Sequence, residues 1–168
     1  MPSAAIPLPF ELRRVEDSGG VESARALFNE YQSDLGIDLS FQGFAEELSG
    51  LPGAYAPPAG RLYLAVQARA PAGCVGLRPV SEQTCEMKRL YVRPAHRRRG
   101  IGRMLAQRAL ADARAIGYKR VVLDTLATMH EAHALYAALG FAETAPYAFN
   151  PVSGVKFLAL DLGADELS

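Results

Sequence analysis

Hydrophobic residues recur at helical spacing in four stretches of the chain. The clearest is 101–116, where apolar residues three and four positions apart line one side and Gly117 follows as a terminator. Residues 21–35, ended by Gly36, and residues 129–139, ended by Gly140, show the same spacing. A fourth stretch, 41–49, follows Ser40, a residue type typical of a helix N-cap. Four helices are therefore predicted.

Shorter runs of alternating or continuous apolar residues predict β-strands, separated by turns rich in glycine and proline. They are residues 10–15, 61–67, 74–80, 84–92, 121–124, 142–147 and 155–162. We expect turns at 18–20 and 70–73 and a loop over 51–60.

The order of the elements is strand, two helices, three strands, helix, strand, helix and two strands. It predicts one α/β domain over 1–168, with a mixed, mostly antiparallel sheet of about seven strands and helices on both faces. The crossover from Thr84 to Asp124 should be parallel and right-handed. Residues 1–9 are expected to be a loose leader and 163–168 a tail.

The composition is that of a folded protein outside the membrane, with 49% apolar and 21% charged residues and a mean hydropathy of +0.02. No apolar run reaches the roughly 18–20 residues that a membrane span needs. The N-terminus lacks a basic segment and is broken by prolines, so it does not resemble a signal peptide. We expect a cytoplasmic protein without a membrane partner.

The net charge of zero hides an asymmetry along the chain. Residues 1–50 carry nine acidic and three basic side chains, a sum of −6, whereas residues 78–120 carry twelve basic and three acidic ones, a sum of +9. Overall neutrality argues against a bulk polyanion such as duplex DNA as the partner.

Cys74 and Cys85 are the two cysteines of the chain. A hairpin that turns near residues 81–83 places Cys85 opposite Pro79 and Cys74 opposite Leu90, too far apart for a disulfide. No cysteine or histidine stands at ligand spacing, so no metal site is expected.

The stretch 92–103 lies between a strand and the strongest helix and combines two glycines with five arginines. Helix N-termini present unpaired N–H groups, and Gly100 and Gly102 allow the backbone to approach a bulky anion. These features suit a pyrophosphate. The stretch lacks the lysine and hydroxyl of a Walker A loop and the third glycine of a dinucleotide fingerprint. A solvated basic turn is the plain alternative, and a nucleic-acid site lacks interleaved aromatic residues.

Three segments resemble the GNAT superfamily of N-acetyltransferases. Residues 97–102 (Arg-Arg-Arg-Gly-Ile-Gly) fit its R/Q-x-x-G-x-G/A signature between the fourth strand and the third helix. Residues 86–92 resemble its fourth strand, and residues 134–141 (Ala-Leu-Tyr-Ala-Ala-Leu-Gly-Phe) resemble its helix end with the pattern L-Y-x-x-x-G-F. By element order the resemblance extends over about 10–162.

The resemblance implies acetyl-CoA as co-substrate, a primary amine as acceptor, direct transfer in a ternary complex and no metal. It places the pyrophosphate at Arg97, Arg98, Arg99, Gly100, Ile101 and Gly102, with Arg103 as an additional charge, and the pantetheine arm along Leu90, Tyr91 and Val92. Tyr136 matches the general acid that protonates the departing sulfur. Glu86 matches a general base of some members, whereas others use water or a different residue.

The family's asparagine seven residues before the helix tyrosine is here Met129, which leaves a CoA-binding regulatory or sensor domain as the alternative function. His130 and His133 are expected to be solvent-exposed helix residues. The acidic residues Glu30, Asp34, Glu46 and Glu47 could attract a cationic amine or form a solvated helix face, and Tyr55, Tyr147 and Phe149 could line the acceptor site or cover the sheet. A homodimer is compatible with the resemblance.

Overall fold

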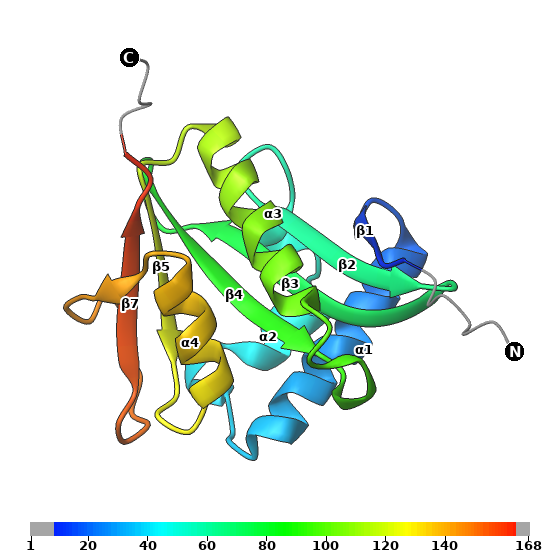
Figure 1. Ribbon diagram of the computed structural model, residues 1–168, viewed down its shortest axis with the longest axis horizontal. Coiled ribbons are helices and arrows are strands. Elements are labelled where there is room, and N and C mark those ends of the chain that lie inside the picture. The colour runs from blue at the N-terminus through cyan, green and yellow to red at the C-terminus, as the bar shows by residue number, and fades with distance from the viewer. Residues whose placement is uncertain (1–8, 164–168) are drawn as a thin grey trace, which may run out of the picture.

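A seven-stranded sheet forms the centre of the computed structural model, which describes residues 9–163 (Figure 1). The strand order is β1-β2-β3-β4-β5-β7-β6, and every neighbouring pair is antiparallel except β4 and β5, which are parallel. The strands are β1 (Glu11–Arg14), β2 (Arg61–Gln67), β3 (Ala70–Pro79), β4 (Thr84–Val92), β5 (Arg120–Thr125), β6 (Ala142–Glu143) and β7 (Lys156–Asp161). The predicted mixed sheet and its parallel crossover are confirmed.

Two pairs of helices cover the two faces of the sheet, as predicted (Figure 1). The helices are α1 (Ser18–Leu35), α2 (Phe44–Ser49), α3 (Ile101–Ile116) and α4 (His130–Ala138). One apolar cluster joins α3 and α4 to the sheet and includes Leu105, Met87 and Phe141. A second cluster joins α1 and α2 to the opposite face and includes Phe28 and Tyr55. The site described below lies where β4 separates these two cores.

The observed boundaries match the prediction for β2, β4 and α3 and differ elsewhere for local reasons. Helix α1 begins at Ser18 because Asp17 caps it, accepting a hydrogen bond of 2.7 Å from the Gly20 N–H, so 18–20 is a first helical turn. Ser40 caps no α-helix: residues 40–42 form a 3-10 turn, and Gly43, with φ +68°, separates it from α2. The turn before β3 lies at Ala68 and Arg69, not at 70–73. Strand β6 is only two residues long.

The parallel pair β4 and β5 stays together only at its beginning. Three register pairs, Thr84 with Arg120, Cys85 with Val121 and Glu86 with Val122, connect the strands. Beyond Glu86, β4 continues to Val92 and β5 to Thr125 without further pairing. This divergence leaves one edge of β4 without a neighbouring strand.

A β-bulge interrupts β4 just beyond the point of divergence. Gly76 of β3 pairs with Lys88 and Cys74 with Tyr91, so Arg89 and Leu90 together face the single residue Val75. Arg89 adopts the left-handed conformation, with φ +61°. As a result Lys88 and Arg89, although consecutive, both point toward α1 and α2, where each donates to Gln42 Oε1.

The same bulge corrects the predicted register of the cysteines. Cys85 is opposite Pro79, as predicted, but Cys74 is opposite Tyr91 and not Leu90, because the bulge adds one residue between the two pairs. Both cysteines are buried and free. Burial raises the thiol pKa of Cys85 to about 12, in keeping with the predicted structural role.

Within residues 9–163, no helix is both long and apolar enough to cross a bilayer. The same residues contain no group of three or more His, Cys, Asp and Glu side chains that could hold a metal ion.

Candidate active site

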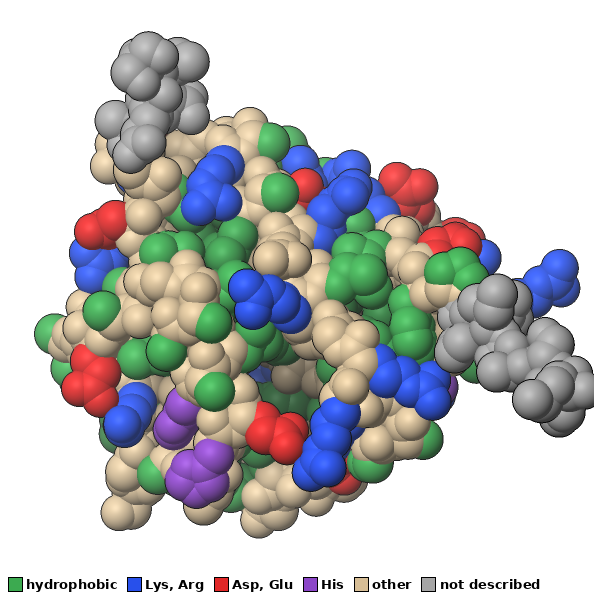
Figure 2. All heavy atoms as spheres, viewed as in Figure 1, with side chains coloured by type: hydrophobic (Ala, Val, Ile, Leu, Met, Phe, Trp, Pro, Cys, Tyr) green, Lys and Arg blue, Asp and Glu red, His purple; other side chains and the backbone are tan. Residues whose placement is uncertain are grey.

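A groove of about 760 Å³ runs along the open edge of β4. Its walls come from α1, the end of β4, the turn that precedes α3, and the beginning of α4. Figure 2 shows the surface hollowed beside α4, with basic side chains near the rim. The lining residues predicted from the sequence are Leu90, Tyr91, Val92, Arg97, Arg98, Gly100, Ile101, Gly102, Arg103 and Tyr136. Arg99 and Glu86 were also predicted as site residues, but neither lines the groove.

The turn that precedes α3 presents unpaired backbone donors. Arg98 and Gly100 both adopt the left-handed conformation, with φ +65° and +78°, and Met104 is the first residue of this helix to bond back, to Gly100 O. The N–H groups of residues 98–103 donate to no protein acceptor within residues 9–163. A Cβ at Gly102 would lie 3.8 Å from Leu135 and Val92, so its absence widens the groove at that point. The donor set therefore fits an anion the size of a pyrophosphate.

The arginines around this turn have different surroundings. Arg97 donates from Nε to Val92 O at 2.8 Å and from Nη2 to Asp34 Oδ2 at 3.2 Å. The Arg98 side chain is 88% exposed, and its Nη2 lies 3.9 Å from Glu131 Oε1. Arg103 lines the groove from the first turn of α3. Charge is thus available at the groove from Arg97, Arg98 and Arg103, whereas Arg99 lies outside its lining.

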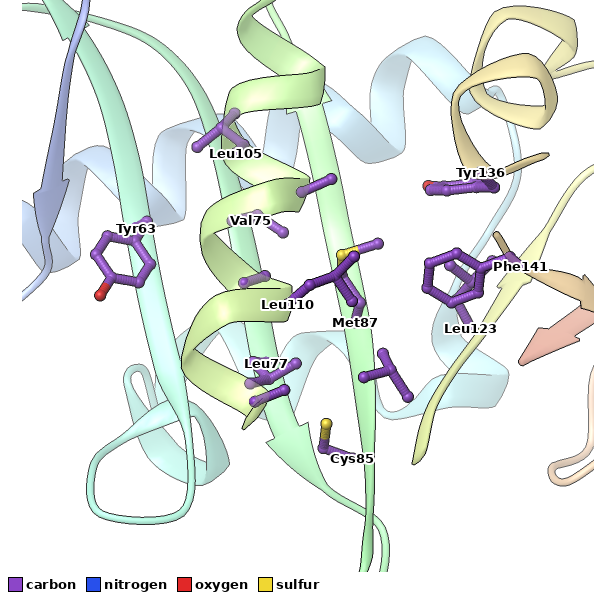
Figure 3. Packing of buried hydrophobic residues seen from close by; sticks show 14 of the residues in the cluster. Tyr63, Val75, Leu77, Cys85, Met87, Leu105, Leu110, Leu123, Tyr136 and Phe141 are labelled. Carbon is purple, nitrogen blue, oxygen red and sulfur yellow. The ribbon is translucent and has the colours of Figure 1, made fainter. Parts of the chain in front are cut away.

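Tyr136 projects from α4 into the divergence of β4 and β5. Its ring packs edge-to-face on Phe141 with centroids 5.7 Å apart, and its hydroxyl is directed toward β4 (Figure 3). Burial raises the pKa of Tyr136 well above its ordinary value of 10, and nearby Tyr31 and Asp124 act in the same direction. The phenol therefore keeps its proton at neutral pH and can donate it.

Met129, which stands where the resembling sequences carry asparagine, also lines the groove. Its Sδ accepts a contact of 3.8 Å from Thr125 Oγ1 at the end of β5. His130 lines the groove as well, whereas His133 is directed back to Leu126 O, 2.8 Å from its Nε2. The beginning of α4 is thereby tied to the end of β5.

Glu86 lies on the α1–α2 side of the sheet, at the last pair before β4 and β5 diverge. Its Oε1 accepts a hydrogen bond of 2.9 Å from Arg78 Nε, and its Oε2 accepts one from the Tyr147 hydroxyl. Lys88 Nζ lies 3.7 Å from the same Oε2. Both oxygens are therefore occupied. This arrangement favours a positioning role for Glu86, and its role as general base stays a prediction.

Acidic residues of the N-terminal segment form ion pairs with some arginines of the basic segment. Glu30 forms a two-pronged ion pair with Arg93, at 2.9 and 2.6 Å, and Asp34 pairs with Arg97. Glu47 holds the buried guanidinium of Arg89 from both oxygens, at 2.9 and 3.0 Å. Glu46 lies exposed on α2. Three of the four acidic side chains considered for the acceptor therefore serve internal ion pairs.

The aromatic residues considered for the acceptor site differ in their positions. Tyr55 is buried in the α1–α2 core, where its hydroxyl donates to Glu47 at 3.1 Å. Tyr147 packs on Phe157 and donates to Glu86, whereas Phe149 is 76% exposed and meets Phe41 edge-to-face. Tyr55 thus covers the sheet, and Phe149 is free to contact a ligand.

A second, narrow pocket, here named the Asp124 pocket, adjoins the groove where β4 and β5 have separated. It shares Tyr31, Leu35 and Met129 with the groove, and Asp124 lies at its polar end. Sequence reasoning passed over Asp124, which stood only as the last residue of a short buried strand. One feature of the sequence could have drawn attention to Asp124. It is a carboxylate at the carboxyl end of the strand 121–124, next to the strand 84–92 that was predicted to run parallel to it.

Comparison with known proteins places this geometry in a family. The model of the acetyltransferase (GNAT) family matches residues 24–141. An N-acetyltransferase of Schizosaccharomyces pombe is 35% identical over 161 residues, which cover 95% of this chain and 93% of the relative. The chain belongs to the GNAT family of acetyltransferases.

Further relatives and solved structures agree with this membership. An N-acetyltransferase of Dictyostelium discoideum is 33% identical over 210 residues, which cover 88% of this chain and 97% of the relative. An acetyltransferase from Streptococcus agalactiae has the same fold, with a TM-score of 0.77 at 21% identity over 91% of this chain and 98% of that one. An acetyltransferase from Salmonella typhimurium, solved with acetyl-CoA, superposes with a TM-score of 0.70 at 18% identity over 93% and 95% of the chains.

The expected GNAT membership, the mixed α/β fold and an acetyl-CoA-dependent acyltransferase activity are thus confirmed. The roles of individual site residues, the cytoplasmic location, the homodimer and the absence of nucleic-acid and membrane partners stay predictions. In this GNAT protein the groove, the basic turn and Tyr136 meet at the open edge of β4.

Proposed function

We propose that this protein transfers the acetyl group of acetyl-CoA to a primary amine by direct attack in a ternary complex. The observation that carries the proposal is the divergence of β4 from β5 after Glu86 and Val122, which opens a groove between a basic turn and a buried tyrosine. An extended pantetheine arm can pair with the free edge of β4 as an added strand would.

The chain's own groups would hold the anionic end of acetyl-CoA at the turn before α3. The unpaired N–H groups of residues 98–103 would donate to this anion, and the positive end of the α3 dipole would add to them. Arg97, Arg98 and Arg103 surround the same position with positive charge. The thioester would then lie deeper in the groove, near the bulge of β4.

Two groups would act on the acetyl transfer itself. The unpaired edge of β4 can donate backbone hydrogen bonds to the thioester oxygen, stabilising the negative charge that develops there. The neutral amine nitrogen forms the new bond to the acetyl carbon as the carbon–sulfur bond breaks. Tyr136 gives its proton to the departing sulfur, and the proton lost by the amine passes to water, which restores the phenol. The sum of these steps is an acetamide and free CoA.

The proposal is tested by measuring thiol release from acetyl-CoA across a panel of primary amines and peptide N-termini. Release that depends on the amine, with the acetylated product seen by mass spectrometry, supports it. Tight acetyl-CoA binding without release in the presence of any amine would instead support the regulatory or sensor domain. No binding of acetyl-CoA by calorimetry would contradict both functions.

A further inference from the structure

The Asp124 pocket is the second cavity that meets the groove at the divergence of β4 and β5. It is narrow, about 20 Å³, which is room for one group the size of a water molecule or an ammonium. It lies next to the groove because Tyr31, Leu35 and Met129 line both. A small group seated in this pocket therefore lies beside the position proposed for the thioester.

Asp124 is the carboxylate at the polar end of this pocket. Its Oδ2 accepts hydrogen bonds from two neutral amides, Gln42 Nε2 at 3.3 Å and Asn150 Nδ2 at 3.0 Å. Within residues 9–163, no lysine, arginine or histidine nitrogen lies within 4.0 Å of it. Asp124 is partly buried, and a carboxylate that is partly removed from water without a cationic partner is stabilised by a cation, so a ligand can supply that cation.

The orientation of the Gln42 amide is fixed by two cationic side chains that donate to its oxygen. Its Oε1 accepts from Lys88 Nζ at 3.1 Å and from Arg89 Nη1 at 2.9 Å, which turns its NH₂ group toward Asp124. Lys88 and Arg89 are themselves held by Glu86 and Glu47. The neighbouring cations are thus already engaged, and the amide, not a cation, reaches the Asp124 carboxylate.

The remaining walls of the pocket are mostly apolar. They are formed by Tyr31, Leu35, Ile37, Leu39, Phe41, Leu126, Met129 and Val152. Arg89 is the cation among the lining residues, and both Glu47 and Gln42 occupy its guanidinium. A carboxylate on the acceptor would find no free positive partner here, whereas an apolar stem that extends from the pocket into the groove would contact the shared side chains Tyr31, Leu35 and Met129.

We propose that Asp124 binds the primary ammonium group of the acceptor, which loses one proton to water before its nitrogen attacks, and that the acceptor is an amine on an uncharged apolar stem without an α-carboxylate. The inference rests on the proposed function and names the substrate class of the same site. Asp124 is then a residue that touches the substrate, and Gln42 and Asn150 are positioning residues that act through its carboxylate.

The test compares two amines with the same stem, pentylamine and norleucine, in the acetyl-CoA thiol-release assay with the wild-type protein. Norleucine is pentylamine with an α-carboxylate in place of one hydrogen, and the pocket does not neutralise that carboxylate. We expect kcat/KM for pentylamine to exceed that for norleucine by about 100-fold. Equal values, or a preference for norleucine, would overturn the proposal without any variant being needed.

The second arm uses Asp124→Asn, with Asp161→Asn as the matched control. Asp161 lies exposed on β7, outside both cavities, so its change removes the same charge elsewhere. Loss of a hydrogen bond to a charged group should raise KM for pentylamine by about 10- to 100-fold in D124N. The acetyl-CoA Kd of D124N and the kinetics of D161N should be unchanged. An unaltered KM in folded D124N contradicts the proposal.

Different results would contradict the acceptor class and the transferase function. Acetylation of a peptide N-terminus but not of pentylamine would overturn the acceptor class and leave the proposed transferase function in place. Absence of acetyl-CoA binding in the wild-type protein would overturn the proposed function, and this inference with it.

Discussion

Arg97 and Asp34 are joined at the groove by a contact of 3.2 Å between Nη2 and Oδ2. The same carboxylate oxygen accepts a hydrogen bond of 2.8 Å from the Tyr91 hydroxyl. Arg97 also lies over the Tyr91 ring, 5.8 Å from its centroid. A group proposed to bind an anion therefore already has an anionic partner, and that partner must compete with the cofactor's phosphates.

Replacing Asp34 by Asn should therefore strengthen acetyl-CoA binding. The amide keeps an acceptor for Tyr91 but removes the competing charge, so Kd should fall about two- to fivefold, the range of a half-exposed ion pair. Calorimetry at low and at high salt is the measurement, and the gain should shrink at high salt. A higher Kd in D34N, with the Kd of D161N unchanged, would contradict a competition between Asp34 and the phosphates for Arg97.

Reversing the charge of Arg103 should weaken acetyl-CoA binding more than reversing that of Arg99. Arg103 lines the groove and Arg99 does not, although the sequence places both beside the glycines. We expect Arg103→Glu to raise Kd by about tenfold or more, and Arg99→Glu to have a smaller effect. Titration calorimetry of both variants decides between them. An equal loss of acetyl-CoA affinity in the two variants would show that Arg99 also contributes to binding.

Tyr136→Phe should lower kcat and leave acetyl-CoA affinity in place. Loss of a positioned proton donor costs about 100-fold or more in rate, whereas the ring and its contact with Phe141 are retained. Steady-state kinetics together with calorimetry separate the two quantities. An unchanged kcat would mean that the sulfur takes its proton from another source.

The pH profile gives a second measurement on the same residue. Because burial holds the pKa of Tyr136 above its ordinary value of 10, the neutral phenol persists as pH rises through 10. We therefore expect the wild-type enzyme and Tyr136→Phe to show the same dependence of kcat on pH near pH 10. A descending limb at that pH, lost in the variant, would contradict the raised pKa.

Glu47 should matter for stability, since its carboxylate holds Arg89 in the protein interior. The side chains are only 9% and 2% exposed, so Glu47→Gln leaves a buried guanidinium without its carboxylate partner. Breaking such a pair costs about 3–5 kcal/mol of unfolding free energy. Urea denaturation is the measurement, with the exposed Glu22→Gln as a control that should change stability by less than about 0.5 kcal/mol.

Acid should reproduce part of this loss. Burial by itself raises the pKa of Glu47, but the hydrogen bonds and charge of Arg89 outweigh it and hold the pKa below its ordinary value of 4.5. The ionised form is the one stabilised by folding, so the contribution is complete above pH 4.5 and is lost as pH falls below it. Glu47→Gln should flatten stability against pH in that range. An unchanged slope would contradict this account.

Periodicity predicted the elements with strong patterns and failed where single residues decided a boundary. The 16 residues of α3 carry an uninterrupted apolar stripe, so both of its ends were predictable. Gly43 could not be identified as a break, because the apolar spacing continues across it from Phe41 to Leu48 and gives no sign of its left-handed φ. For the site, motif spacing predicted the groove lining, since Gly100, Gly102 and Tyr136 follow the chain locally.

Asp124, Gln42 and Asn150 could not be predicted together from the sequence. They come from β5, from the segment between α1 and α2, and from the loop before β7, so that only the tertiary fold makes them neighbours. The pairing of Glu47 with Arg89 was hidden for another reason. Strict alternation along β4 would place Arg89 on the face opposite Lys88, and nothing in the residue pattern marks the bulge that places both on one face.

The bulge in β4 divides one continuous strand into two halves that are out of phase. Before it, odd-numbered residues such as Met87 pack under α3; after it, the even-numbered Leu90 and Val92 do so. A deletion of Arg89 or Leu90 would restore regular alternation and leave Tyr91 on the face of α1 and α2, but only one of Lys88 and Arg89 would then face Gln42. The reaction centre thus depends on the one extra residue that the bulge adds to β4. Substitutions that keep the chain length constant can neither add nor remove this residue.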